Sequence, residues 1–312
     1  MLDSALIDIS LREGYQLLHF KSLPSTNDFV KQLLSGQLEL AASEQVDTSL
    51  PTVVVADWQS GGRGRLGRSW HSPEGGVYLS LLWPDLLAAE AAACLPLLVA
   101  LATRFALQPL IDRRILVKWP NDLLLDSGAE VQHKLAGILV ELINWRAVIG
   151  IGVNVFSGVA LPAGSGAAEQ GAAEPNRPAY LVEHFVGGQP GVEQPGVEQL
   201  GAALPSSALP SAALATESQS EILSRIVDTI VKCNIDYLDR WQNLDKNFAA
   251  FADEYRNHMA RLGESVQISN ALGQMVAEGV LAGIDNSGQV IIQNGDETCG
   301  IISGDITFRC DG

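Results

Sequence analysis

Residues 61–68 carry the clearest chemistry in the sequence: they read Gly-Gly-Arg-Gly-Arg-Leu-Gly-Arg. Glycine permits backbone conformations that turn successive N–H groups toward one point, and each guanidinium adds a fork of hydrogen-bond donors. The chain has 20 Lys and Arg against 36 Asp and Glu, a net charge of −16. An anionic ligand therefore needs a local cluster of cations, and we interpret residues 61–68 as an anion-binding loop. The alternative is an exposed basic turn.

The same loop fits the pattern G-x-G-x-x-G through Gly62, Gly64 and Gly67. A dinucleotide-binding fingerprint requires a strand directly before the glycines and a helix directly after them. Here residues 57–61 intervene before the motif, and the turn-forming residues 72–76 follow it. The sequence context therefore argues against a dinucleotide fold.

Other motifs place polar or small residues at the ends of predicted elements. Residues 118–122 (Lys-Trp-Pro-Asn-Asp) put an amide and a carboxylate after a strand, which suits a nucleotide with Mg²⁺ or a plain turn. Lys134 begins an otherwise apolar strand. It either belongs to an anion-binding site or lies at a solvated strand end. Gly150 and Gly152 alternate along a strand and allow close approach of a ligand or of sheet neighbours. Residues 25–27 (Ser-Thr-Asn) either cap a helix or bind a ligand.

The predicted strands and helices that must position these motifs do not follow a regular strand–helix–strand alternation. Residues 24–28 start a helix with Ser25 as its cap. Further predicted elements are strands at 52–56, 77–83 (closed by Pro84), 115–119, 138–142 and 147–155, and a helix at 88–107. The last two strands predict an antiparallel hairpin because only residues 143–146 separate them. The pattern predicts an α+β fold with a mixed sheet.

From about residue 157 to 216 the composition shifts to Ala, Gly, Pro, Ser and Glu, and residues 189–193 are repeated directly at 194–198. Such a segment buries little apolar surface. We expect residues 187–216 to be a disordered insertion.

Regular structure is predicted again from Ser218, where a capping box starts a helical pair that runs to His258. After Gly263 the pattern becomes short strands separated by turns at 285–288 and 294–296. This pattern predicts a small antiparallel barrel.

The charge disfavours nucleic acid and membrane surfaces as partners, because a net charge of −16 repels phosphate backbones and anionic lipid. The barrel shares this bias: it has one basic residue, Arg309, and seven acidic ones, 1 − 7 = −6. The four cysteines are scattered without metal-ligand spacing, which predicts reduced, structural thiols in the cytoplasm. No signal peptide is expected, and the apolar stretch 91–102 is short for a membrane span.

Taken in order, these motifs resemble the biotin protein ligase family. The matching stretches are residues 25–27, Gln59 with 62–68 and Trp70, 118–122, 134–141 and 150–154, then 221–241, 283–285 and 304–309. The resemblance implies a ligase that activates biotin with ATP and Mg²⁺ as biotinyl-5′-AMP and transfers it to one lysine of a biotin carboxyl carrier protein. It also implies a biotin/lipoate ligase-like catalytic domain at residues 15–260 and an SH3-like barrel at 262–312.

The same resemblance implies roles for individual residues. Lys134 would bridge the biotin carboxylate and the α-phosphate, and Arg63 and Arg65 would close over the intermediate. The implied biotin-binding residues are Ser25, Thr26, Asn27, Gln59, Gly62, Arg63, Gly64, Arg65, Lys134 and Gly152. The implied ATP-binding residues are Arg68, Trp70, Asn121, Asn154, Asp305 and Arg309, with Asp122 as a metal ligand.

The chain departs from repressor-type members of that family, since only 24 residues precede Ser25 and they show no three-helix pattern with a basic recognition helix. We therefore expect no operator binding. The rival functions are a lipoate or octanoate ligase of related fold and a non-catalytic, biotin-responsive regulator. The exposed edge of the predicted hairpin could pair with a carrier strand or with a second subunit in a homodimer.

Overall fold

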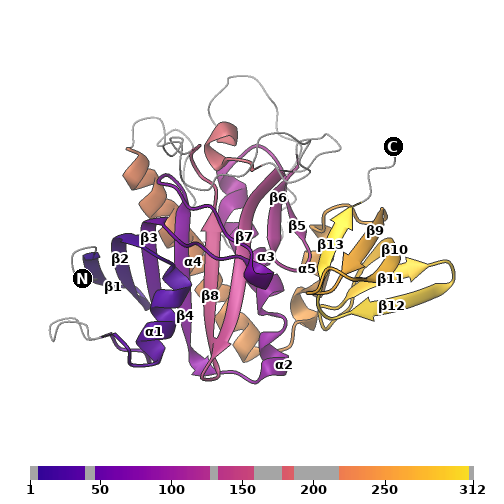
Figure 1. Cartoon of the computed structure of the whole chain (residues 1–312), viewed down its shortest axis with the longest axis horizontal. Coiled ribbons are helices and arrows are strands. Elements are labelled where there is room, and N and C mark those ends of the chain that lie inside the picture. Colours follow the sequence, from indigo (N-terminus) through magenta and orange to yellow (C-terminus); the bar gives the residue numbers. More distant parts are fainter. Residues whose placement is uncertain (1–5, 39–45, 127–132, 158–177, 186–217, 309–312) are drawn as a thin grey trace.

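The computed structural model describes residues 6–38, 46–126, 133–157, 178–185 and 218–308. The predicted insertion at 187–216 and Arg309 lie outside these residues. An eight-stranded mixed sheet with the order β1-β2-β3-β4-β8-β7-β6-β5 organises the larger part (Figure 1). Its strands are β1 (Leu6–Arg12), β2 (Tyr15–Leu23), β3 (Thr52–Gln59), β4 (Val77–Leu86), β5 (Ile115–Lys118), β6 (Asp122–Leu125), β7 (His133–Ile143) and β8 (Arg146–Val153). Only β2 and β3 pair in parallel; the other neighbours are antiparallel.

Helices cover both faces of this sheet. Helix α1 (Thr26–Leu34) packs on one face, and α3 (Leu95–Leu107), α4 (Gln219–Asn243) and α5 (Ala249–Asn257) lie on the other (Figure 1). Strand β4 serves both cores because its side chains alternate: Leu79 and Leu81 join the large helical core, whereas Leu82 joins the core under α1. The predicted mixed-sheet α+β architecture is therefore confirmed.

Both predicted helix starts are present. Ser25 is the N-cap of α1 and accepts a hydrogen bond from the Asp28 amide at 3.4 Å. Ser218 and Glu221 form the predicted capping box of α4, and α4 with α5 makes the predicted helical pair. Local side-chain capping is thus recognisable from sequence because its partners are only a few residues apart.

Several predicted boundaries were wrong, and β7 begins at His133, five residues before the predicted strand 138–142. Strand β4 continues past Pro84 to Leu86, and its register against β8 shifts between Leu82 and Leu86. Proline is tolerated at such a bulge because no ladder N–H is needed there. The predicted helix at 88–107 is two helices, α2 (Ala89–Ala92) and α3.

The run Ala89–Leu110 is 22 residues long, and an 18-residue window within it has a mean hydropathy of 1.6, so its length and composition would allow it to cross a membrane. The run is longer than the predicted apolar stretch 91–102. In the fold, 61% of that window is buried, with α3 packed between the sheet and α4. A core helix accounts for this composition.

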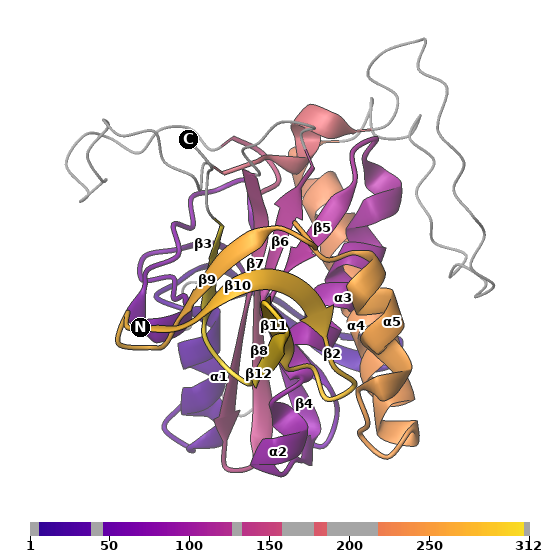
Figure 2. The same ribbon diagram turned by 90° about the vertical axis from the view of Figure 1, so that its right-hand side faces the viewer.

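The chain ends in a five-stranded antiparallel sheet of order β12-β11-β10-β9-β13. Its strands are β9 (Ser265–Ser269), β10 (Met275–Ile284), β11 (Val290–Asn294), β12 (Glu297–Ile301) and β13 (Asp305–Phe308). The predicted turns at 285–288 and 294–296 join β10 to β11 and β11 to β12. Figure 2 shows the curved sheet from outside, a shape compatible with an SH3-like barrel.

The barrel shares its core with the larger part of the molecule. Val266, Ile268 and Leu281 belong to the same apolar cluster as the helices. Trp119, which is 2% exposed, donates from Nε1 to the carbonyl oxygen of Gly288 at 3.0 Å. The division into domains 15–260 and 262–312 stays a prediction, since the two parts pack on one continuous core.

The predicted hairpin, β7 with β8, lies inside the sheet. Strand β8 pairs with β4, and β6 pairs with β7 over residues 133–137. Within the described residues, the half of β7 from Leu139 to Ile143 pairs only with β8. The predicted pairing of this hairpin with a carrier strand or a second subunit stays a prediction, and it concerns only residues 139–143.

Three described cysteines are free thiols. Burial raises the pKa of Cys94 and of Cys233 to about 11, as expected for inert core residues. Cys299 is also a free thiol but is exposed on β12, so a structural role for this residue stays a prediction.

We expect Trp119→Phe to lower the free energy of unfolding by about 1–3 kcal/mol, because the buried Gly288 carbonyl loses its hydrogen-bond donor. Chemical denaturation followed by circular dichroism measures this. Trp145, 62% exposed, is the matched control; Trp145→Phe should change the stability by less than ~0.5 kcal/mol. Equal effects of the two substitutions would contradict this account of Trp119.

Candidate functional site

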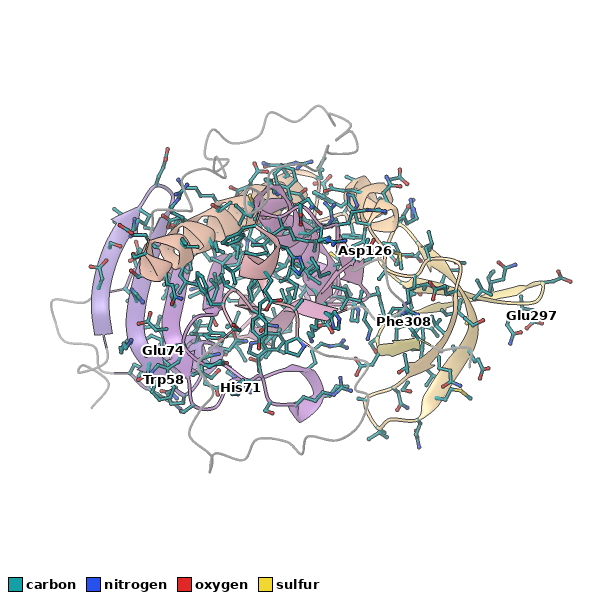
Figure 3. All side chains as sticks on the ribbon, turned by 90° about the horizontal axis from the view of Figure 1, so that it is seen from above. Trp58, His71, Glu74, Asp126, Glu297 and Phe308 are labelled. Atoms are coloured by element: carbon teal, nitrogen blue, oxygen red, sulfur yellow. The ribbon has the colours of Figure 1, made fainter. Side chains whose placement is uncertain are left out.

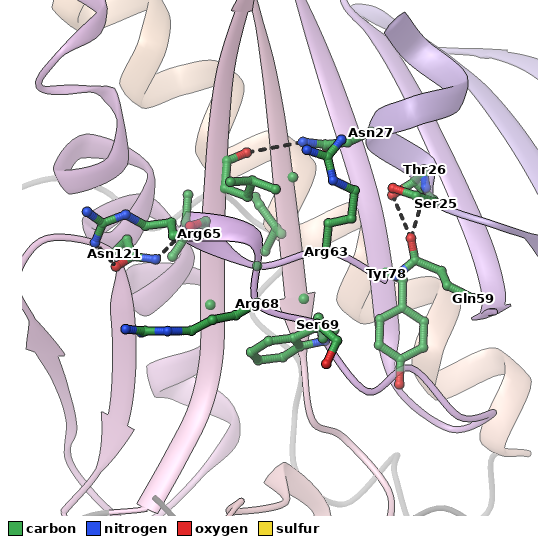
Figure 4. A pocket seen from close by; sticks show the side chains of 18 of the residues that line it. Ser25, Thr26, Asn27, Gln59, Arg63, Arg65, Arg68, Ser69, Tyr78 and Asn121 are labelled. Atoms are coloured by element: carbon green, nitrogen blue, oxygen red, sulfur yellow. Dashed lines mark hydrogen bonds between the residues drawn. The ribbon is translucent and has the colours of Figure 1, made fainter. Parts of the chain in front are cut away.

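A pocket opens on the α1 face of the sheet, above β4, β8 and β7 and beneath the Gly/Arg loop (residues 61–68). Figure 4 shows side chains from α1, β3, β4 and this loop converging on it. Its lining residues are Ser25, Thr26, Asn27, Gln59, Arg63, Gly64, Arg65, Arg68, Ser69, Trp70, Tyr78, Leu79, Asn121, Asp122, Lys134, Gly137, Ile138, Leu139, Gly150, Ile151, Gly152 and Asp305.

One end of the pocket is a polar floor whose amides are held in fixed orientations. Gln59 Oε1 accepts from the Thr26 backbone N–H at 2.8 Å, and Gln59 Nε2 donates to Ser72 Oγ at 2.9 Å. Ser80 Oγ lies 2.8 Å from Thr26 Oγ1 and donates to Asn27 Oδ1. Because each amide has a defined donor and acceptor side, the floor presents a fixed hydrogen-bonding pattern to a ligand.

Asn27 is anchored from behind by Glu141 of β7. Asn27 Nδ2 donates to Glu141 Oε2 at 2.9 Å, and its side chain is buried. Ser25 both caps α1 and lines the pocket. The cap role at residues 25–27 is therefore confirmed, and the ligand role stays a prediction supported by position.

Glycines let side chains reach the surface of the sheet. A Cβ on Gly150 would lie 2.5 Å from Asn27 Oδ1, and one on Gly152 would lie 2.6 Å from Trp70 Nε1. Gly137 also faces the Trp70 ring, at 2.9 Å from an added Cβ. The alternating glycines thus make room for the floor and for the Trp70 indole, whose N–H has no hydrogen-bond partner in the described structure.

Lys134 is the only lysine among the described residues that line the pocket. Its Nζ is 2.9 Å from Asp122 Oδ1 and 5.0 Å from the centroid of the Trp70 ring. The lysine side chain is 28% exposed and the aspartate 18%. An ammonium held against an aromatic face and one carboxylate can exchange that carboxylate for the anion of a ligand.

A second cation, Lys118, lies at the end of β5. Its Nζ is 5.2 Å from the centroid of the Phe308 ring of the barrel, which Figure 3 labels. Burial lowers the pKa of Lys118, the Asp122 charge opposes this shift, and the Lys134 charge adds to it. The end of β5 therefore adds a partly buried cation close to Lys134 and Asp122.

Arg63 ties the Gly/Arg loop to the sheet and to α1. Its guanidinium donates to Asp28 and to Glu141, and Lys31 also donates to Glu141, at 3.0 Å. Burial opposes ionisation of Asp28, but hydrogen bonds from Lys31 and Arg63 outweigh it and hold the pKa of that carboxyl below its usual value.

Arg65 and Arg68 tie the other end of the loop to the barrel. Arg65 Nη1 donates to Asn121 Oδ1 at 2.9 Å and to Asp305 Oδ1 at 3.2 Å. Arg68 donates to the other oxygen of Asp305. Asp305 starts β13, so the barrel supplies one wall of the pocket.

The structure brings nearly all the predicted site residues to this one pocket. Gly62 and Asn154 do not line it. Gly62 lies where a Cβ would be 2.3 Å from the Trp70 carbonyl oxygen, so it allows the loop to fold back on itself. Asn154 Nδ2 donates to the Lys134 carbonyl at 3.0 Å and so supports the lysine from its backbone. Arg309 lies outside the described residues.

Sequence reasoning did not find Tyr78, Ser80, Asp28 and Glu141. Ser80 is fully buried in an otherwise apolar strand, and Glu141 interrupts the apolar run of β7. A single polar residue in a buried strand must find a partner, and this signal could have identified both.

The described residues offer little to a resident metal ion. They contain no group of three or more His, Cys, Asp or Glu placed to bind one. Asp122 is paired with Lys134, and Asp305 with Arg65 and Arg68. These residues do not fit a dedicated cation site, and Asp122 as a metal ligand stays a prediction.

Comparison with known proteins shows the family to which this chain belongs. The sequence model of the "Biotin/lipoate A/B protein ligase family" matches residues 20–155. The biotin–[acetyl-CoA-carboxylase] ligase of Paracoccus denitrificans is 30% identical over 250 residues, which cover 77% of this chain and 83% of the relative. This chain belongs to the biotin protein ligase family.

Two further similarities bear on the extent of the match. The bifunctional ligase/repressor BirA of Escherichia coli is 41% identical over 107 residues, so the chain spans only 32% of its length. The structure of biotin protein ligase from Aquifex aeolicus, in complex with biotin and ATP, superposes with a TM-score of 0.62. That superposition covers 94% of this chain and 98% of the other at 24% identity, and supports the fold.

We expect Asp305→Ala to release the Gly/Arg loop, because Arg65 and Arg68 lose their common carboxylate. Trypsin should then cleave after residues 63, 65 and 68 about fivefold faster, the change that ~1 kcal/mol of lost local stability gives. Timed digestion with mass spectrometry measures the rate. The control is Asp296→Ala, on the exposed turn after β11; trypsin should cleave it at the same rate as the wild type. Unchanged cleavage in Asp305→Ala would show that the barrel does not hold the loop.

Proposed function

We propose that this protein activates biotin with MgATP as biotinyl-5′-AMP and transfers the biotinyl group to a lysine of a biotin carboxyl carrier protein. The observation that carries this proposal is one pocket with a fixed polar floor at one end and a cation cluster at the other. Family membership supports the same reaction.

The floor and the Trp70 wall suit the shape of biotin. Biotin has a ureido ring with two N–H donors and one carbonyl acceptor, an apolar sulfur-containing ring, and a chain that ends in a carboxylate. The hydroxyls of Ser25 and Thr26 and the amide of Asn27 offer matching donors and acceptors at the floor. Trp70 offers an apolar face beside Lys134.

The cations at the other end of the pocket, Lys134, Arg65 and Arg68, reduce the repulsion between the two anions of the first step. A carboxylate oxygen attacks the α-phosphorus of ATP and pyrophosphate leaves, so two anions must approach each other. In this proposal Lys134 contacts both anions, and Arg65 and Arg68 bind the phosphates. Each cation gives up a protein carboxylate, Asp122 or Asp305, when it binds the ligand's anion.

In the second step the amine of the carrier lysine attacks the acyl carbonyl, AMP leaves, and the amine loses a proton. The intermediate is a reactive mixed anhydride, so it must be held away from water until the carrier arrives. The Gly/Arg loop over the pocket suits this role, with Arg65 as the cation that attaches it to the adenylate. Mg²⁺ enters with ATP as part of the substrate.

The net charge of −16 supports the rest of the proposal: a cytoplasmic enzyme that binds neither nucleic acid nor membranes. The carrier domain is proposed as its macromolecular substrate. A lipoate or octanoate ligase and a non-catalytic regulator remain the rivals.

One assay separates these three functions. Purified protein with MgATP is given biotin, lipoate or neither, and pyrophosphate release is measured. We expect pyrophosphate release with biotin and not with lipoate, because the polar floor matches a ureido ring that lipoate lacks. Release with lipoate alone would identify the lipoate ligase, and no release with either acid would favour the regulator.

Lys134→Ala should reduce biotin-dependent pyrophosphate release by about 10²–10³-fold, the cost of removing one group that stabilises transition-state charge. The fold should persist, since a partly exposed lysine packs little. The control is Lys232→Ala, which removes an exposed lysine on α4 and should leave the rate unchanged. A folded Lys134→Ala protein with a rate near that of Lys232→Ala would remove Lys134 from the catalytic residues.

A further inference from the structure

Four polar side chains form a chain of hydrogen bonds that ends at the floor of the pocket. Glu141 of β7 is at one end, Asn27 and Ser80 follow, and Thr26 is at the other end, where it lines the pocket (Figure 4). Thr26, Asn27 and Ser80 are 4%, 3% and 0% exposed. Because these groups are shielded from solvent, their neighbours in the chain decide which atom carries the proton of each bond.

Glu141 begins this chain purely as an acceptor. Its Oε1 accepts from Lys31 at 3.0 Å and from Arg63 at 3.3 Å. Its Oε2 accepts from Asn27 Nδ2 at 2.9 Å. A carboxylate offers an acceptor on both sides, so it satisfies the two cations and the amide at once.

The bond from Asn27 to Glu141 sets the direction of the next two bonds. With Nδ2 on the side of Glu141, the Asn27 oxygen Oδ1 is on the side of Ser80, and an amide oxygen can only accept. The single hydroxyl proton of Ser80 is therefore used by Asn27. Thr26 Oγ1 lies 2.8 Å from Ser80 Oγ, so the proton of that bond comes from Thr26.

The Thr26 hydroxyl consequently has no proton left for a ligand. Its other polar neighbour, Gln59 Oε1, is farther away, at 3.2 Å, and already accepts from the Thr26 backbone N–H at 2.8 Å. Because Ser80 uses the hydroxyl proton, Thr26 Oγ1 offers only lone pairs to the pocket. This point of the floor therefore favours a ligand with a hydrogen-bond donor.

We propose that Glu141 is a positioning residue that makes the Thr26 hydroxyl an acceptor and thereby selects a ligand ring that carries an N–H group. This inference rests on the proposed function, since the ureido ring of biotin supplies such a group. Glu141 is not among the residues that line the pocket, so it acts through Asn27 and Ser80. A ring without a donor leaves the oriented hydroxyl unpaired, which is how a polar site rejects close analogues.

Glu141→Gln should reverse the direction of every bond in the chain. The new amide turns its oxygen to the two cations, which attract it most strongly, and its Nε2 toward Asn27. Asn27 then rotates and donates to Ser80, Ser80 donates to Thr26, and the Thr26 proton points at the N–H of the ligand. We expect about tenfold weaker biotin binding, the effect of one mismatched buried hydrogen bond. Isothermal titration calorimetry without ATP measures this.

Combining Asn27→Asp with Glu141→Gln should restore the original direction. The new amide donates to the new carboxylate, whose other oxygen accepts from Ser80 as in the wild type. Asn27→Asp alone places two carboxylates side by side and should weaken biotin binding by about tenfold or more at about pH 8, where both are ionised. The double variant should bind within about threefold of the wild type. The remaining difference reflects the longer bond from Asn27 Nδ2 to the Leu139 carbonyl, at 3.4 Å, which the exchange does not restore.

Thr26→Val separates this role from a merely structural one, because it removes the hydroxyl on which the chain acts. Adding Glu141→Gln to Thr26→Val should change the biotin affinity by less than about twofold, since the two substitutions affect the same bond. A further tenfold loss in this background would show that Glu141→Gln only loosens the pocket, and it would overturn the proposal.

Glu90→Gln is the matched control, since it is the same substitution at an exposed residue of α2. It should bind biotin like the wild type. If Glu141→Gln binds as tightly as Glu90→Gln, or if the double variant binds no more tightly than the single variants, the role of Glu141 is refuted and the proposed function stands. A wild type that binds no biotin would overturn both.

Discussion

Charge compensation around the pocket is the interaction on which the rest of this structure depends. The chain is strongly acidic, yet it gathers Arg63, Arg65, Arg68 and Lys134 at one site, where like charges repel. Carboxylates from α1, β6, β7 and the barrel pair with them. The cations are thereby held in place, and a ligand's anions can take over partners that the protein already provides.

The floor of the pocket follows a different constraint, the pairing of buried polar groups. Ser80, Asn27 and Glu141 lie in or beside apolar strands, where an unpaired polar atom destabilises the fold. Their mutual hydrogen bonds remove that cost and at the same time fix the direction of each donor and acceptor. The same contacts that stabilise the floor therefore orient its polar groups, and Gly150 stands where a side chain would collide with Asn27.

The barrel and the Gly/Arg loop are coupled through one carboxylate. Asp305 brings the barrel into contact with the Gly/Arg loop, so loop position and barrel position are coupled. Residues 258–260 cover the edge at β5, next to the barrel. The edge at β1 lies at the opposite side of the sheet.

The sequence by itself determined the short-range features: the caps at Ser25 and Ser218, the hairpin of β7 and β8, the barrel turns, and the cationic character of residues 61–68. Each of these depends on residues close together in the chain, so spacing and residue type reveal it. Through family resemblance, the sequence also indicated most of the residues that now line the pocket. Only the tertiary structure decided which carboxylate pairs with which cation, that Ser80 and Glu141 support the floor, and that β4 passes Pro84. These outcomes depend on contacts between segments far apart in sequence, such as Arg65 with Asp305, and such contacts are set by how the whole chain packs.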